Sequence, residues 1–355
     1  MVNKAIQDSF LSLVRLGIGK PSPGIPSDMD WNAVETLARK QGLMAVLVDA
    51  VNRADRVDAL PFTTKLAWIG EVAQGYERVY MLYRKAVANL AAFYSAHGFK
   101  MMVLKGYGCS LNWPRPEHRP CGDIDIYLLG KYKEADETLT RELGIRIDHS
   151  HQHHTVFEWQ GFTLENHYDF INIQANFSSR KLEKVLKGLA EGTDEKGMIF
   201  PSANLHALFL IRHMVLHFTA ISISLRQVLD WAFFVDKNGE EVDWEWLLPL
   251  LEQYHMKEFF DCINAICTDE LGFNWLSTFG LNIKEEGLRW KERILQDILE
   301  PEFDDVEPQG LLRRVHFKYR RWKANAWKRK LCYEESDWNS FWNGVWNHLL
   351  KPASI

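Results

Sequence analysis

Two aspartates spaced two residues apart, Asp123 and Asp125, are the residues of this sequence best suited to do chemistry. Ile124 and Ile126 alternate with them, which is typical of a strand. Successive side chains on a strand point to opposite faces, so both carboxylates would share one face while the isoleucines enter the core. Neighbouring carboxylates raise each other's pKa, and a bound divalent cation relieves that repulsion. The pair therefore predicts a metal site.

A third carboxylate is available on a later segment. Residues 162–169 alternate, which places Glu165, His167 and Asp169 on one face of a second predicted strand. Either Glu165 or Asp169 could complete a site with three carboxylates.

A group suited to phosphate lies before the aspartates. Lys105 and Gly106 close the apolar run 101–104, so an ammonium and backbone N–H groups would lie where the next helix begins, a place that favours anions. Arg119 lies in the loop that leads to the acidic strand and could add a second phosphate contact.

Three regions must position these residues. Residues 1–98 have helical periodicity, with Pro61 opening the longest helix. Residues 99–200 change to a period of two, and residues 158–161 are predicted to form a hairpin turn. The helical period returns over residues 201–355. We therefore predict an α+β fold in which a sheet-containing core is flanked by helical N-terminal and C-terminal regions.

The order of these parts is similar to that of the nucleotidyltransferase superfamily, the fold of DNA polymerase β and the aminoglycoside nucleotidyltransferases. The sequence resembles one bacterial branch, the uncharacterised nucleotidyltransferase family, through Leu104, Lys105, Gly106, Arg119, Asp123, Ile124 and Asp125. The resemblance extends over most of the chain through His153, His154, Glu165, His167, Leu225, Arg226, Asp230 and residues 242–244.

The resemblance implies a small mixed sheet and a metal-dependent transferase. Such an enzyme moves a nucleoside monophosphate from a nucleoside triphosphate, with ATP expected, to a hydroxyl-bearing acceptor whose identity stays open. Two Mg²⁺ ions are expected, with Mn²⁺ as the alternative, and Glu165 is preferred over Asp169. The implied catalytic and metal-binding residues are Asp123, Asp125 and Glu165, and the implied nucleotide- and phosphate-binding residues are Lys105, Gly106, Ser110, Arg119 and His167.

Two other functions stay open at this point. The same scaffold could serve as a non-catalytic nucleotide-binding or protein-interaction module. A resistance enzyme that modifies a small molecule, or one that nucleotidylates a protein, would also fit.

A histidine tract precedes the third carboxylate and comprises His149, His151, His153 and His154. No cysteine or second histidine cluster lies near enough in sequence to complete a zinc tetrahedron, so polar strand residues are favoured over structural zinc. One of these histidines, with His167 across the hairpin, could instead line the substrate site.

Two pairs of residues lie four apart on predicted helices. His213 and His217 are expected to be packed histidines, although their spacing could also bind a metal. Arg226 and Asp230 are expected to form an ion pair within their helix, with nucleotide contact as the alternative.

Composition limits the remaining possibilities. The 355 residues carry a net charge of −5, which argues against a general nucleic-acid binder. The five cysteines have no Cys-x-x-Cys spacing, so neither a disulfide framework nor a zinc ribbon is indicated. No secretion signal or membrane span is evident, and a cytoplasmic protein is expected.

A basic stretch from residue 311 to residue 331 holds nine Lys and Arg residues. Acidic segments flank it at 300–307 and at Glu334, Glu335 and Asp337. We predict a terminal helix with a solvated basic face and inward aromatics, and not a nucleic-acid platform.

Overall fold

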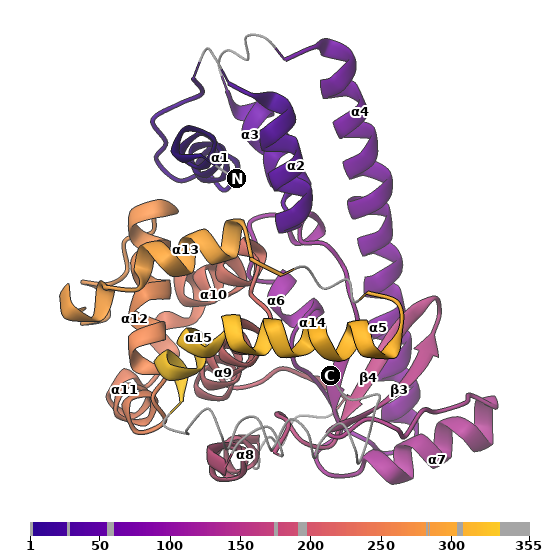
Figure 1. The fold of residues 1–355 in the computed structure, drawn as a ribbon. Coiled ribbons are helices and arrows are strands. Elements are labelled where there is room, and N and C mark those ends of the chain that lie inside the picture. The colour runs from indigo at the N-terminus through magenta and orange to yellow at the C-terminus, as the bar shows by residue number, and fades with distance from the viewer. Residues whose placement is uncertain are drawn as a thin grey trace.

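The fold is α+β, with many helices around one small mixed sheet (Figure 1). A computed structural model describes residues 3–26, 29–54, 60–173, 177–190, 197–281, 283, 285–303 and 308–333. Glu334, Glu335, Asp337 and residues 304–307, which were expected to flank the basic stretch, lie outside the described residues.

The sheet has five strands in the order β3-β4-β2-β1-β5. The strands are β1 (Met101–Val103), β2 (Ile124–Tyr127), β3 (His154–Trp159), β4 (Phe162–His167) and β5 (Met198–Ile199). β2 runs parallel to β4, and β1 is antiparallel to β2 and parallel to β5. In the central parallel pair Asp125 lies opposite Glu165, so the fold brings two of the predicted metal ligands together.

The predicted hairpin joins β3 to β4. Its two turn residues, Gln160 and Gly161, both have positive φ, at 50° and 86°, as a two-residue turn of primed type requires. In the antiparallel register that follows, His154 lies opposite His167.

The sheet lies between two hydrophobic clusters because its buried strands alternate. Met101 and Val103 of β1 belong to the cluster that contains α5 (Arg78–Ala96) and α7 (Tyr132–Leu143). Met102 of the same strand faces the other, larger cluster. Both faces of β1, the strand beside β2, are therefore covered by hydrophobic side chains, which gives the candidate site a rigid support.

The N-terminal helices match the predicted helical region. They are α1 (Lys4–Gly17), α2 (Trp31–Gln41), α3 (Met44–Arg53), α4 (Phe62–Val72) and α5, with a π-helical turn at Ala73–Glu77. Pro61 is the N-cap of α4, as expected, and α4 continues through the π-helical turn into α5 as one long rod (Figure 1).

The prediction of a strand period over residues 99–200 was wrong in part. Three helices lie there: α6 (Tyr107–Ser110), α7 and α8 (Phe177–Ala190). The buried positions of α7 include Asp136 and Thr138 beside Ala135 and Leu139, so hydrophobicity alone marks its inner face only weakly.

Over its described residues the C-terminal region is helical, as expected. It contains α9 (Ala203–Ala220), α10 (Leu225–Asn238), α11 (Trp244–Gln253), α12 (Lys257–Ala265), α13 (Lys291–Leu299), α14 (Leu311–Ala324) and α15 (Ala326–Cys332). Short 3-10 segments lie at Pro116–His118, Gly239–Glu241 and Glu285–Leu288, and a π-helical turn lies at Ile266–Glu270. The larger hydrophobic cluster contains residues of α1–α4 and of α9–α13, so both helical regions share one core.

The basic stretch forms two helices, α14 and α15, rather than one. Lys328 is buried and its ammonium donates to Asp297 at 2.6 Å, and Trp327 packs on Phe218. Tyr319, however, is exposed, so the inward packing expected of the aromatics holds for only part of the stretch.

Two further expectations concern cysteine and membrane. All five cysteines are free thiols. Within the described part of the chain, we find no helix with both the length and the apolar character needed to cross a bilayer.

Candidate functional site

Two carboxylates and an imidazole form the centre of the site. Asp125 on β2 is 3% exposed, and Glu165 is its register partner on β4. Together with His167 they offer one ligand atom each, all within 4.8 Å of one another. Carboxylate oxygens and an imidazole nitrogen are a donor set that can bind a divalent cation.

His167 lies between the two carboxylates. Its Nε2 is 3.1 Å from Asp125 Oδ1 and 3.3 Å from Glu165 Oε2. Burial by itself would lower the pKa of His167, but the hydrogen bonds to both carboxylates outweigh burial and raise it. The pKa of Glu165 is lowered: burial opposes this, while the hydrogen bond from His167 and the charge of Lys105 favour the ionised carboxylate.

Lys105 lies two residues beyond the end of β1 and reaches one of these carboxylates. Its Nζ lies 3.0 Å from Asp125 Oδ1. Burial would lower the pKa of Lys105, but the charges of Asp125 and Glu165 raise it, so the ammonium is held charged. The predicted phosphate-binding residue is therefore located at the metal-binding candidates, and its contact with phosphate stays a prediction.

Asp123 lies one residue before β2 and its side chain is exposed. Its pKa is raised by partial burial and then by the charges of Glu165 and Asp125. Among the described residues Asp123 is not part of the group of ligand atoms within 4.8 Å. The structure thus joins two of the three predicted acids directly and places the third within their electrostatic field.

Gly106 allows the chain to pass close to Asp125. It has φ 62° and ψ −101°, a conformation that side chains rarely adopt. A Cβ there would lie 2.7 Å from Tyr83 Oη and 3.0 Å from the Asp123 carbonyl oxygen. Tyr83 Oη donates a hydrogen bond to that carbonyl at 2.8 Å, which fixes the segment entering β2. Tyr83 was missed because, in the sequence, it is one more aromatic on a helix face.

Two predicted phosphate contacts are engaged elsewhere. The Ser110 hydroxyl is buried, donates to the Tyr107 carbonyl at 2.7 Å and lies 3.2 Å from Tyr80 Oη. Arg119 is 7% exposed and donates from Nε and Nη2 to the two carboxylate oxygens of Asp230, at 2.7 and 2.9 Å. These bonds give no support to the predicted phosphate contacts, which remain untested.

The helix ion pair predicted between Arg226 and Asp230 was wrong. Asp230 pairs with Arg119 and also accepts from Trp113 Nε1 at 2.8 Å. A buried carboxylate needs several donors, and the loop before β2 supplies them.

Asp169, the alternative third carboxylate, lies beyond the end of β4. Its Oδ1 is 2.5 Å from Lys187 Nζ of α8. Its position favours Glu165 as the third acid, a choice that remains a prediction.

Four other predicted histidines lie near this centre. His153 and His154 lie beside His167, with ring centroids 5.5 and 5.2 Å from its ring. On α9 the rings of His213 and His217 contact each other at 4.3 Å. Burial, followed by the charge of Lys105, lowers the pKa of both, that of His217 to about 4.

Comparisons with known proteins give one match. No curated protein and no solved structure matches the chain. A family model described as an uncharacterised nucleotidyltransferase matches residues 27–272, a span that contains every predicted site residue. Because the match covers more than half of the 355 residues, the chain belongs to the uncharacterised nucleotidyltransferase family, which supports a nucleotidyltransferase activity.

Proposed function

We propose that this protein is a metal-dependent enzyme that moves a nucleoside monophosphate from a nucleoside triphosphate, with ATP expected, to a hydroxyl-bearing acceptor. One observation carries the proposal. Asp125 and Glu165 face each other on neighbouring parallel strands, with the Lys105 ammonium beside them, inside the span of the family match.

The residues present fit a divalent cation. Three carboxylates share one electrostatic field, since Glu165 and Asp125 both raise the pKa of Asp123. We infer that Asp123, Asp125 and Glu165 hold Mg²⁺, with Mn²⁺ as the alternative. Bound ions would neutralise the triphosphate and the charge that develops during transfer.

The protein's own groups orient the substrates. Lys105, whose ammonium now pairs with Asp125, would bind triphosphate oxygens, and the Gly106 backbone would line the same approach. Asp123 is the exposed acid of the three, so it would accept the proton of the acceptor hydroxyl. The acceptor oxygen bonds to the α-phosphorus, the α–β anhydride bond breaks, and pyrophosphate leaves.

Nucleotide binding without turnover is the second candidate. The charge of Asp125 is already balanced by ion pairs with Lys105 and His167. Such pairing would allow the acids to serve a structural role in a protein that binds nucleotide without turnover.

Pyrophosphate release separates the two functions. The protein is incubated with each nucleoside triphosphate and Mg²⁺ in the presence of panels of hydroxyl-bearing small molecules and proteins. We expect acceptor-dependent pyrophosphate release that Asp123→Asn abolishes, whereas Asp236→Asn, a surface change elsewhere, leaves it intact. If the protein binds nucleotide but releases no pyrophosphate with any acceptor, nucleotide binding without turnover is favoured instead.

A further inference from the structure

Three histidine rings gather beside the carboxylate pair. His153 lies directly before β3, His154 is the first residue of β3, and His167 is the last residue of β4. One ligand atom of each ring lies within 4.8 Å of the others. The rings of His153 and His154 have centroids 4.4 Å apart. Both strands of the hairpin therefore contribute to one imidazole cluster.

The Nδ1 atom of each ring is buried and has no hydrogen-bond partner among the described residues. His154 and His167 are 7% and 3% exposed. Buried polar atoms in folded proteins are almost always paired, so three such atoms in one cluster require an explanation. A cation or an ordered water would satisfy them.

The carboxylates fix which nitrogen of His167 carries the proton. Its Nε2 faces Asp125 Oδ1 and Glu165 Oε2, which accept hydrogen bonds when ionised. In the neutral ring Nε2 must then be the donor and Nδ1 holds a lone pair. His154 Nε2 lies 3.8 Å from Glu165 Oε1, which is close enough for electrostatic attraction but too far for a hydrogen bond. A ring that donates to a carboxylate through one nitrogen and presents the other is typical of metal-bound histidine.

We propose that His153, His154 and His167 bind a divalent transition-metal ion of the Zn²⁺ class through their imidazole nitrogens. Such ions favour imidazole, whereas Mg²⁺ favours oxygen, so this site differs from the one proposed for the nucleotide. Three protein ligands leave a fourth position for water.

The hairpin brings His167, which is distant in sequence, to the histidine tract. Zinc was disfavoured for the histidine tract because no second histidine cluster follows nearby, but the register of β3 and β4 brings His167 to the tract. The backbone is also fixed, since the His153 carbonyl accepts from the N–H groups of Tyr168 and Asp169. The ion would tie the two strands together and hold His167 against the carboxylates.

Metal binding can be measured without nucleotide, so the test does not depend on the proposed transferase reaction. The full chain is freed of metal with a chelator and titrated with Co²⁺, whose visible spectrum reports coordination, and with Zn²⁺ by calorimetry. We expect calorimetry to show one strong Zn²⁺ site per chain. The Co²⁺ spectrum should show the bands of tetrahedral coordination without thiolate charge-transfer bands. Excess Mg²⁺ should not displace either ion.

Two variants locate the site. His153→Gln should weaken Zn²⁺ binding about 10-fold or more, by analogy with the loss on disturbing the surroundings of a metal ligand. His149→Gln, an exposed histidine on the same segment, should leave binding unchanged. Equal affinity in His153→Gln and the wild type would overturn the proposal. Thiolate bands in the wild-type Co²⁺ spectrum would also overturn it, and that result needs no variant to fold.

Discussion

Gly106 is the single residue whose replacement tests the backbone geometry of the site most sharply. Its φ of 62° and ψ of −101° strain any other residue, and an added Cβ meets Tyr83 Oη and the Asp123 carbonyl. We expect Gly106→Ala to lower the free energy of unfolding by about 3 kcal/mol, the upper end of the range for a strained backbone residue. Denaturant unfolding provides the measurement.

Gly144 is the matched control for this change. It also has a positive φ, 65°, but an added Cβ would meet no atom within 4 Å. Gly144→Ala should therefore cost about 1 kcal/mol, the penalty of the left-handed conformation by itself. Equal costs for the two variants would mean that the close approach at Gly106 contributes nothing.

At the same scale, the sequence predicted the residue types of the site better than their partners. Alternation indicated that Asp125 and Glu165 each lie on a strand face, but it carries no information on which strands pair. The Lys105–Asp125 ion pair and the placement of Asp123 just before β2 both depend on that pairing. Arg119 shows the same limit, since its partner Asp230 is 111 residues away in sequence.

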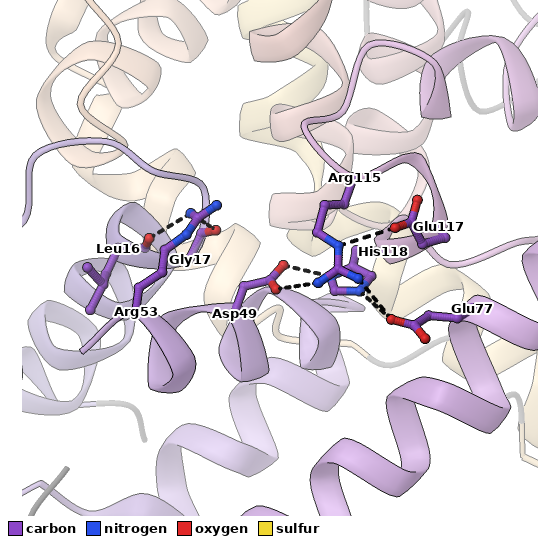
Figure 2. A network of polar contacts seen from close by, with 8 residues as sticks. All are labelled: Leu16, Gly17, Asp49, Arg53, Glu77, Arg115, Glu117 and His118. Atoms are coloured by element: carbon purple, nitrogen blue, oxygen red, sulfur yellow. Dashed lines mark hydrogen bonds and ion pairs between the residues drawn. The ribbon is translucent and has the colours of Figure 1, made fainter. Parts of the chain in front are cut away.

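At the scale of elements, a polar junction joins the N-terminal helices to the loop before β2 (Figure 2). His118 donates from Nδ1 toward Asp49 of α3 at 2.6 Å and from Nε2 toward Glu77 of the π-helical turn at 3.1 Å. Arg115 donates to the same two carboxylates and to Glu117. Because both ring nitrogens face carboxylates, the charged imidazolium satisfies this junction best.

The junction should make stability depend on pH. Burial and the charge of Arg115 oppose protonation of His118, but its hydrogen bonds to Asp49 and Glu77 raise the pKa above 6.5. A histidine with a higher pKa in the folded state than in the unfolded state stabilises the fold when it is protonated. This stabilisation is complete at a pH below the pKa of the unfolded state, and it is lost as the pH rises through the pKa of the folded state. We therefore expect the stability difference between the wild type and His118→Gln to be largest below pH 6.5 and to shrink above it.

Denaturant unfolding over a pH series measures that difference. His97→Gln is the control, because His97 is exposed and lies at the end of α5, away from the junction. A difference for His118→Gln that stays constant or grows with rising pH would contradict the assignment of a charged His118.

Helices and strands were easiest to predict where the hydrophobic periodicity extends over a long segment. The rod formed by α4 and α5 and the hairpin of β3 and β4 were both indicated, the second by its turn residues Gln160 and Gly161. The helix α7 was missed because buried Asp136 interrupts its apolar face. That carboxylate accepts hydrogen bonds from Thr155 and Asn166 across the hairpin, so the partners that allow its burial are distant in sequence.

At the scale of the whole molecule, Arg119 and Asp230 join the segment before β2 to α10. Both side chains are almost fully buried. Breaking a buried pair leaves one charge uncompensated, so Arg119→Met and Asp230→Leu should each lower the free energy of unfolding by about 3–5 kcal/mol. The double variant should regain most of that loss, because two apolar side chains can replace the pair.

Glu71→Gln is the control for these variants, since it breaks an exposed ion pair with Arg39 and should cost less than about 1 kcal/mol. Losses of that small size at Arg119 and Asp230 would contradict their role as a junction. The double variant, if folded, also tests whether Arg119 contacts phosphate. ATP binding should be weaker in this variant if Arg119 contacts phosphate, and unchanged if Arg119 only positions the loop.

The division into regions 1–98, 99–200 and 201–355 remains a prediction. One hydrophobic cluster contains side chains from the first helices and from α9–α13, a sharing that no local pattern in the sequence could reveal. Hydrophobic periodicity indicates which face of a helix or strand is buried, but it does not indicate which other element covers that face.

The central claim is that three carboxylates bind a nucleoside triphosphate through a divalent cation. The most direct measurement is calorimetric titration with an α,β-methylene ATP analogue, with and without Mg²⁺, for the wild type, Asp123→Asn and Glu165→Gln, alongside thermal melts. Asp236→Asn and Glu137→Gln, which change exposed acids elsewhere, are the matched controls. We predict Mg²⁺-dependent binding that falls at least about 10-fold in each site variant, equivalent to about 1.4 kcal/mol, with the melting temperature of Asp123→Asn unchanged. Binding that needs no divalent ion, or that persists in both site variants, would contradict the claim.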